Sequence, residues 1–282
     1  MKIRSICLLL TLLFLLGACA RPEAETPSST AGDKTEESLS LPDSTPSSAP
    51  DPVPDETETA EEVFSPETKR ILAYGIDVSK WQGNIDWKKV SEAGVEFSMI
   101  RIGYGEGNGA CGLDPFALRN LQEATKHGIH VGVYLYSAAS TPEEAEAEAE
   151  FVLEKIAPYS VTYPVVIDVE LGGNASQITP RRRTQVALGF LRKVQEAGYQ
   201  GMLYALREEF EDPALWDASL LLEEFPVWIA DYAEAAPPDA EYPETEYDYA
   251  MWQYSCTGRV SGIAGDVDRN VSYHPFEEQG AK

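Results

Sequence analysis

Short apolar runs alternating with helix-like stretches are the feature that most constrains how this chain can fold. From residue 71 onward the runs are ILAYGIDVS, FSMIRIGYG, VGVYLYS, PVVIDVE, GMLYA, PVWIADY and AMWQYS, all of strand length. Runs that are apolar at nearly every position suit strands buried on both faces, as in a parallel sheet. Residues 71–282 are therefore expected to form an α/β domain around a parallel sheet.

Helical stretches lie between the early runs, at Trp87–Ala93, Pro115–Lys126, Pro142–Ala157 and Pro180–Ala197. Three of them are followed by Gly94, Gly128 and Gly198. Glycine is favoured just past a helix because it adopts a positive φ without strain. The phrases EAGVEF, KHGIHVGVY and EAGYQGMLY thus each predict a helix end followed by a strand.

The alternation of strands and helices ends after Tyr232, where AEAAPPDAEYPETEYD is a poor helix and CTGRVSGIAGD is short and rich in glycine. We count about five strand–helix units and then three strands with irregular links. The 212 residues of 71–282 are near the lower limit for an eight-stranded barrel. The predicted fold is an α/β TIM-like barrel of about five strand–helix units completed by three further strands.

The first 70 residues are expected to be a targeting signal and a tether. Residues 1–18 have a basic start, an eleven-residue apolar stretch and the ending LGA before Cys19. The stretch is too short to span a bilayer, which needs about 20 helical residues. LGAC resembles a bacterial lipobox, which predicts acylation of Cys19; the alternative is an ordinary signal peptide with a chance cysteine. Residues 19–70 are rich in Pro, Ser, Thr and Glu and are predicted to be a disordered tether.

The net charge of −25 is concentrated outside the signal, with −9 on residues 19–70 and −18 on residues 71–282. An acidic body without a basic stripe argues against nucleic acid and against an anionic membrane surface as partners. The basic run Arg181–Arg183 is expected to be a solvated face making salt bridges, or else a contact for wall carboxylates or phosphates. The alternation in PEEAEAEAEF predicts the solvent side of a helix.

Carboxylates end several of the apolar runs, at Asp77, Asp168, Glu170, Asp231 and Asp268. In a barrel of this kind, chemistry occurs at the C-terminal ends of the strands, so we expect the active site there. Asp168 and Glu170 are two apart on one strand and point to the same side. Crowding should raise one pKa, that of Glu170, and a neutral carboxyl beside carboxylates is what protonation of a glycosidic oxygen requires.

Other chemistries have weak support. A G-x-S-x-G elbow and a Walker loop are absent from the sequence, and the three histidines are not in metal-ligand spacing. We therefore expect neither a metal nor a cofactor. Cys7 leaves with the signal, which leaves Cys111 and Cys256 in an exported protein. The pair is a disulfide candidate across the barrel mouth, the alternative being two separate thiols.

The motifs of residues 71–282 resemble glycoside hydrolase family 25, the Chalaropsis-type lysozymes. The resemblance runs through GIDVSKWQGNIDW, FSMIRIGYG, GVYLYSAASTPEEAEAEAEF, YPVVIDVE, VWIADY and WQYSCTGRVSGIAGDVDRN. It implies cleavage of the β-1,4 bond between N-acetylmuramic acid and N-acetylglucosamine. It also implies that Glu170 is the general acid and that Asp168, Asp77 and Asp268 are the other catalytic acids. Where the family often has His-His, this chain has Lys80-Trp81.

The same resemblance implies that sugars bind against aromatic side chains, at Tyr134, Tyr136, Trp228 and Trp252. The expected mechanism is retaining and substrate-assisted, with Asp168 orienting the 2-acetamido group; a carboxylate acting as direct nucleophile is the alternative. The competing functions are a non-catalytic wall-glycan-binding lipoprotein and a glycosidase on another N-acetylated polysaccharide. We expect a monomer, lipid-anchored in a bacterial cell membrane, whose catalytic domain faces the wall and its peptidoglycan strands.

Overall fold

The computed structural model describes residues 69–170 and 177–276. The predicted signal peptide, Cys19 and nearly all of the predicted tether lie outside the described residues, so they stay predictions. Within the described residues, no helix is long and apolar enough to cross a bilayer.

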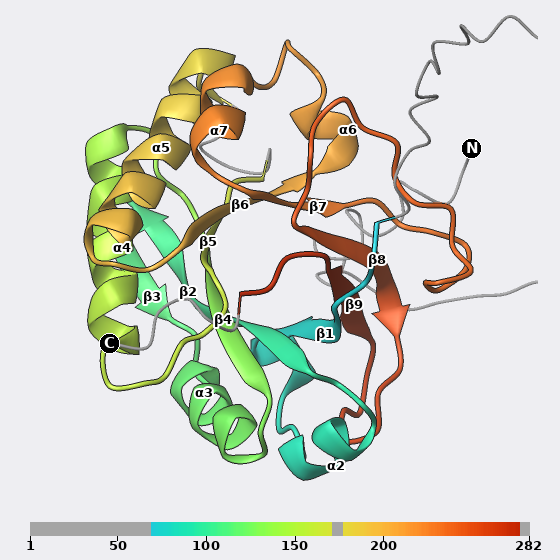
Figure 1. Cartoon of the computed structure of the whole chain (residues 1–282). Coiled ribbons are helices and arrows are strands. Elements are labelled where there is room, and N and C mark those ends of the chain that lie inside the picture. The colour runs from blue at the N-terminus through green and yellow to red at the C-terminus, as the bar shows by residue number, and fades with distance from the viewer. Residues whose placement is uncertain (1–68, 171–176, 277–282) are drawn as a thin grey trace, which may run out of the picture. The chain divides into compact units, whose positions relative to one another are not determined.

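The described strands form one sheet that closes into a barrel (Figure 1). They are β1 (Ala73–Val78), β2 (Phe97–Gly107), β3 (Ala110–Leu113), β4 (His130–Tyr136), β5 (Val165–Asp168), β6 (Gly201–Leu206), β7 (Val227–Ala230), β8 (Met251–Gly258) and β9 (Val267–Ser272). The order is β1-β9-β8-β7-β6-β5-β4-β2-β3, and a parallel β1–β2 pairing closes the ring. The predicted TIM-like fold is confirmed, with eight barrel strands and β3 added as a hairpin on β2.

Among the eight barrel strands, one runs against the others. The pairings from β1 through β2, β4, β5, β6 and β7 to β8 are parallel, whereas β9 is antiparallel to both β8 and β1. The beginning of β9 therefore lies at the same rim as the C-terminal ends of the other barrel strands. This places Asp268, the second residue of β9, at that rim; the expectation that it ends its strand was wrong.

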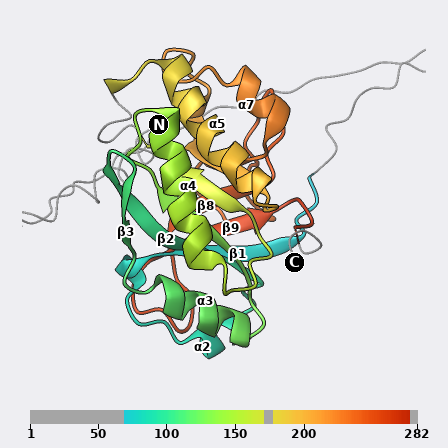
Figure 2. The same cartoon turned by 90° about the vertical axis from the view of Figure 1, so that its left-hand side faces the viewer.

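Helices follow the first five parallel strands and cover the outside of the barrel, as Figures 1 and 2 show. They are η1 (Lys80–Gln82), α2 (Trp87–Glu92), α3 (Ala117–Lys126), α4 (Pro142–Ile156), α5 (Pro180–Glu196), α6 (Arg207–Phe210) and α7 (Ser219–Glu224). The four predicted helices are confirmed as α2 to α5. The sequence pattern missed the short α6 and α7.

Local signals explain the helix ends. Thr141 and Thr179 cap α4 and α5 by accepting hydrogen bonds from backbone N–H groups, and a proline follows each cap. Gly94, Gly128 and Gly198 adopt φ values of 82°, 76° and 84°, which confirms the predicted chain reversals. These caps return the chain to the sheet and so place each strand end at the same rim.

The N-terminal end of the barrel interior is an apolar plug. Phe97 stacks on Tyr163 with ring centroids 4.6 Å apart, and Tyr163 packs on Phe276 at 5.2 Å. Phe97 begins β2 and Phe276 follows the antiparallel β9, so both belong to this end. The polar side chains of the barrel interior therefore lie at the opposite rim, together with the predicted acids.

Candidate active site

Asp77 and Asp268 are brought into direct contact by the pairing of β1 and β9. The two residues are register partners in this antiparallel pair, and their side chains hydrogen-bond to each other. Asp77 is only 5% exposed. Two carboxyl groups this close cannot both be ionised without a large electrostatic cost, so the pair is expected to share one proton.

Amide side chains from β8 and β9 hold Asp77. Gln253 Nε2 and Asn270 Nδ2 each donate a hydrogen bond of 2.8 Å to its Oδ2. These donors favour the ionised form of Asp77, although burial raises its pKa. Burial and the Asp77 charge raise the pKa of Asp268 to about 9. The shared proton is therefore assigned to Asp268, and Asp77 is the carboxylate of the pair.

A second layer of side chains fixes those amides. Tyr204 and Tyr232 donate their hydroxyl protons to Gln253 Oε1, at 3.0 Å and 3.1 Å. Trp228 Nε1 donates to Asn270 Oδ1 at 3.0 Å. Since each amide oxygen accepts, each amide nitrogen must face Asp77. The network orients the carboxylate before any substrate arrives.

Asp168 ends β5, and Glu170 follows it two residues later. Asp168 is 5% exposed, and its Oδ1 atom is buried without a hydrogen-bond partner within the described part of the chain. Burial, and then the charges of Glu170 and Asp77, raise the pKa of Asp168 well above its ordinary value. Burial also raises the pKa of Glu170. Crowding was expected to act mainly on Glu170, but the structure shows its effect on Asp168.

An arginine lies close enough to Asp168 to favour its ionised form. Arg101 on β2 lowers the pKa of Asp168 against the larger effect of burial. Its guanidinium group is held by the buried Asp114, whose Oδ2 accepts from Nε at 3.0 Å and from Nη2 at 2.8 Å. The rim therefore holds Arg101, a cation that is itself fixed in place, near several carboxyl groups.

Tyr134 and Tyr136 of β4 are half-buried beside these acids. Burial, followed by the charge of Asp77, raises the pKa of Tyr134. Burial, followed by the charges of Glu170 and Asp168, raises the pKa of Tyr136 to about 12. Both hydroxyls stay protonated at neutral pH and can donate hydrogen bonds at the rim. Their predicted contact with sugar stays a prediction.

The two tryptophans that were predicted to bind sugar are buried, unlike the two tyrosines. Trp228 and Trp252 are each 1% exposed, so neither presents a ring face on which a sugar could stack. Trp228 faces the barrel interior and supports Asn270, whereas Trp252 donates from Nε1 to the Asp231 carbonyl oxygen at 2.7 Å. The prediction of direct sugar binding was wrong for both, because strand-end aromatics also fill a small barrel.

The predicted disulfide between Cys111 and Cys256 is not formed, because Cys111 is a free thiol. Cys111 lies on β3, opposite Gly105 in the β2–β3 hairpin, whereas Cys256 lies on β8. The sequence pattern could not show that Cys111 belongs to a hairpin strand paired with β2. Burial and the charge of Glu148 raise the pKa of this thiol to about 12, so it is a poor nucleophile.

Sequence reasoning missed several residues of the site. Gln253 and Asn270 lie inside the recognised segment WQYSCTGRVSGIAGDVDRN, but the amides themselves were not singled out. Glu209 on α6 gave no signal. Burial and the charge of Glu170 raise the pKa of Glu209, which places this half-buried carboxyl close to the proposed acid.

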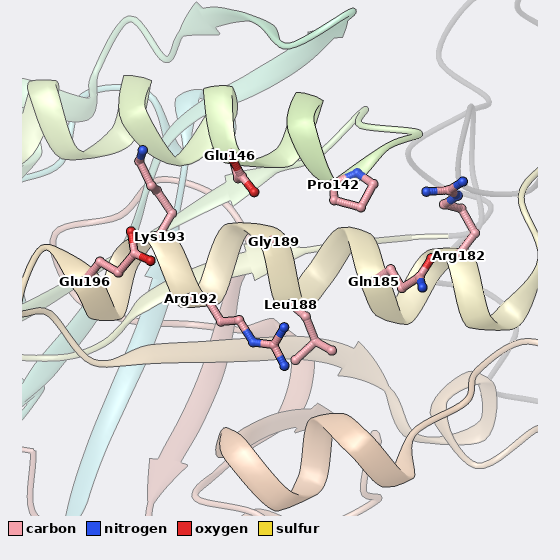
Figure 3. A pocket seen from close by; sticks show the side chains of 9 residues that line it. All are labelled: Pro142, Glu146, Arg182, Gln185, Leu188, Gly189, Arg192, Lys193 and Glu196. Atoms are coloured by element: carbon pink, nitrogen blue, oxygen red, sulfur yellow. The ribbon is translucent and has the colours of Figure 1, made fainter.

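Two cavities lie away from the acids. One of about 390 Å³ lies between α4 and α5, where Figure 3 shows Lys193 reaching toward α4 and Arg192 reaching away from it. Lys193 pairs with Glu150 at 2.6 Å, and Arg192 pairs with Glu224 at 2.5 Å. The other, of about 810 Å³, lies beside α6 and α7. Neither is lined by any of the four predicted catalytic acids.

The basic run 181–183 does not form one surface. Arg183 is 2% exposed, with its guanidinium 5.7 Å from the Trp216 ring, whereas Arg182 lines the cavity between α4 and α5. The expectation of a solvated face was wrong for Arg183, because α5 turns this side chain into the protein, whereas Arg181 and Arg182 are exposed. Within residues 69–170 and 177–276, no group of three His, Cys, Asp or Glu side chains is placed to hold a metal ion.

Comparisons with known proteins agree with this geometry. The family described as Glycosyl hydrolases family 25 matches residues 76–263. YegX of Escherichia coli strain K12, described as an uncharacterized protein, is 30% identical over 212 residues, covering 73% of this chain and 71% of YegX. Lysozyme M1 of Streptomyces globisporus is 29% identical over 204 residues, covering 70% of this chain and 66% of that protein.

A solved structure also resembles this fold. The modular autolysin LytC of Streptococcus pneumoniae, in complex with a synthetic peptidoglycan ligand, superposes with a TM-score of 0.54 at 26% identity. The match covers 71% of this chain and 46% of the LytC chain. The matched part of this chain therefore spans about half the length of the LytC chain.

Proposed function

The chain belongs to family 25 of the glycosyl hydrolases, and we propose that it cleaves the β-1,4 bond between N-acetylmuramic acid and N-acetylglucosamine in peptidoglycan. Membership makes it a glycoside hydrolase. The substrate is supported by its likeness to Lysozyme M1 and to LytC, which was solved with a peptidoglycan ligand. The observation that carries the proposal is the pair formed by the buried Asp168 and the partly buried Glu170 at the barrel rim.

Glu170 is assigned as the general acid. Its carboxyl group is partly buried, and burial raises its pKa, which favours the protonated form that a general acid needs. That proton is transferred to the glycosidic oxygen as the bond breaks. The resulting carboxylate then accepts a proton from the attacking water, as microscopic reversibility requires of a retaining reaction.

Asp168 is assigned to the 2-acetamido group of the substrate. Its buried Oδ1 has no hydrogen-bond partner among the described residues, which is costly unless a donor is supplied. The acetamido N–H is such a donor. Accepting this bond favours the ionised form of Asp168 and turns the acetamido carbonyl oxygen toward the anomeric carbon. The reaction proposed is therefore retaining and substrate-assisted.

Product analysis tests the bond and the mechanism separately. We would digest purified peptidoglycan and identify the new reducing end by mass spectrometry. Muramic acid at that end supports the proposal, and glucosamine would contradict it. Glycan strands whose muramyl amino groups have been deacetylated should not be cleaved. Cleavage of those strands at the normal rate would instead favour a carboxylate as the nucleophile.

We also propose that the enzyme is held at the bacterial cell membrane by acylation of Cys19, with the barrel outside the cytoplasm. The support is the LGAC ending of residues 16–19 and the polar composition of residues 20–70. Acyl chains partition into the bilayer with about 0.8 kcal/mol for each buried CH₂ group, so two or more chains anchor stably. The tether would then set how far the active site reaches into the wall.

A further inference from the structure

Trp81 is exposed in a protein that buries its other tryptophans. Its exposed fraction is 70%, whereas the other four tryptophans are all at 3% or less. A single exposed apolar residue is ordinary on a protein surface. Trp81 is unusual because it belongs to the loop directly after β1, the strand that carries Asp77.

The backbone beneath Trp81 is held rigidly. The residue lies in η1, whose capping residue Ser79 accepts a hydrogen bond from Trp81 N at 3.3 Å and donates its own N–H to Gln82 Oε1 at 2.9 Å. Lys80 N donates to the buried Asp114 Oδ2 at 2.9 Å. An exposed indole on a fixed turn loses little conformational entropy when a ligand covers it.

A lysine without a carboxylate partner accompanies the indole. Lys80 Nζ lies 4.9 Å from the centre of the Trp81 ring and 5.7 Å from that of the Tyr104 ring. Within residues 69–170 and 177–276 it makes no ion pair, although the domain is strongly acidic. Its charge is available for an anionic group of a ligand.

The same turn borders the active site. Gln82 Nε2 donates to the Asp266 carbonyl oxygen at 3.3 Å, and Asp266 is two residues before Asp268. Tyr104 lies on the part of β2 that pairs with β3. η1 therefore lies between the β2–β3 hairpin and the β8–β9 loop, at the rim next to Asp77 and Asp268.

We propose that Trp81 and Lys80 form a distal sugar-binding subsite for a muramyl residue beyond the cleaved bond. The apolar C–H face of the pyranose would stack on the exposed indole, and the Lys80 ammonium group would bind the carboxylate of the lactyl substituent. This inference rests on the proposed function, because it assumes a glycan strand that crosses the rim.

Substrate length tests the stacking contact. We would measure kcat and KM for Trp81→Ala on a tetrasaccharide and on an octasaccharide of the alternating glycan, with Trp81→Tyr as the conservative variant. The expected result is a KM about tenfold higher on the octasaccharide, which corresponds to 1.4 kcal/mol, with kcat unchanged. The tetrasaccharide should be unaffected, and Trp81→Tyr should restore most of the loss. Leu220→Ala, which removes another exposed apolar side chain, is the control.

The outcomes separate this inference from the proposed function. Wild-type protein that cleaves neither oligosaccharide would contradict the proposed function itself. Active wild-type protein with an unchanged Trp81→Ala variant, or with an equal loss on both lengths, would overturn only the subsite.

Substituent chemistry tests Lys80. Lys80→Gln should raise the KM for strands with free lactyl carboxylates and match the wild type on strands whose carboxylates are blocked as methylamides. An equal effect on both kinds of strand would overturn the role given to the ammonium group.

Discussion

Among single residues, Asp77 and Asp168 show how neighbours give similar carboxyl groups different properties. Asp77 accepts hydrogen bonds from two amides and from Asp268, so its negative charge is stabilised. Asp168 Oδ1 is buried and accepts no hydrogen bond from the described residues. The charge of Asp77 is thus stabilised by the protein itself, whereas we propose that the substrate supplies the donor to Asp168.

Glu170→Gln is expected to abolish lytic activity while the fold stays intact. The amide has nearly the same size but cannot donate the catalytic proton, so kcat should fall by about 10²–10⁴-fold. The measurement is turbidity loss of purified wall suspensions, with circular dichroism to verify folding. Glu154→Gln is the matched control, since Glu154 is exposed on α4 and pairs with the neighbouring Lys155. A fully active Glu170→Gln variant would refute the assignment.

Glu148→Gln should change how stability depends on pH. Glu148 is fully buried on α4, and burial raises its pKa from 4.5 to about 7. Because the folded state binds this proton more tightly than the unfolded chain, wild-type stability should fall as pH rises from about 4.5 to about 7. The variant lacks this loss, so relative to the wild type it should gain about 1–3 kcal/mol between these limits.

Urea unfolding at pH 5 and at pH 8 measures this difference. Glu146→Gln, on the exposed side of the same helix, should show no such gain. Parallel pH profiles for the Glu148→Gln variant and the wild type would contradict the prediction.

At the scale of elements, the β2–β3 hairpin and α4 meet around Glu148. Ser137 Oγ donates to Glu148 Oε2 at 2.6 Å, and Ala138 N donates to Oε1 at 3.1 Å. Both donors lie in the loop after β4, which begins next to Tyr136. A buried carboxylate on a helix thus holds the loop that borders the active site.

Gly105→Ala should disturb this junction. A Cβ atom at Gly105 would lie 2.2 Å from Glu148 Oε1 and 2.5 Å from Ala138 N, so the carboxylate or the loop must move. Forcing a methyl group into a packed interior typically costs about 1–3 kcal/mol, which urea unfolding can measure. Gly265→Ala, where nothing lies within 4 Å, should be neutral. Equal stabilities of the two variants would show that the junction adapts freely.

For the whole molecule, we propose that acylation of Cys19 decides where the enzyme acts. Cys19→Ala, or inhibition of lipoprotein processing with globomycin, should move the protein from the membrane fraction to the soluble fraction. The reason is that the apolar stretch of residues 6–16 is too short to anchor the chain by itself. Fractionation followed by immunoblotting measures the shift, and unchanged membrane association would refute the lipid anchor.

A domain that starts at Lys69 should fold and cleave isolated walls. Lys69 Nζ pairs with Asp248 at 2.9 Å, donates to the Tyr249 carbonyl oxygen at 3.2 Å and lies 3.5 Å from the Tyr249 ring centre. A domain that starts at Ile71 loses these contacts and should melt about 2 °C lower. Differential scanning calorimetry tests the comparison; identical melting temperatures would show that Lys69 contributes nothing.

The sequence by itself determined the elements and their order. Strand-length apolar runs, proline and threonine at helix starts, and glycine at helix ends are local signals, so β1, β2, β4 to β8 and the helices α2 to α5 could be predicted. Asp77 and Asp168 were found for the same reason, because a charged residue near the end of a buried strand stands out without knowledge of its neighbours.

Only the tertiary structure decided what those residues contact. The antiparallel direction of β9 pairs Asp268 with Asp77, and Cys111 is a free thiol on the β2–β3 hairpin instead of half of the predicted disulfide. The burial of Trp228 and of Glu148 likewise depends on packing between elements far apart in the chain. Strand direction and burial arise from long-range pairing and from the closure of the barrel, which no local pattern of residues encodes.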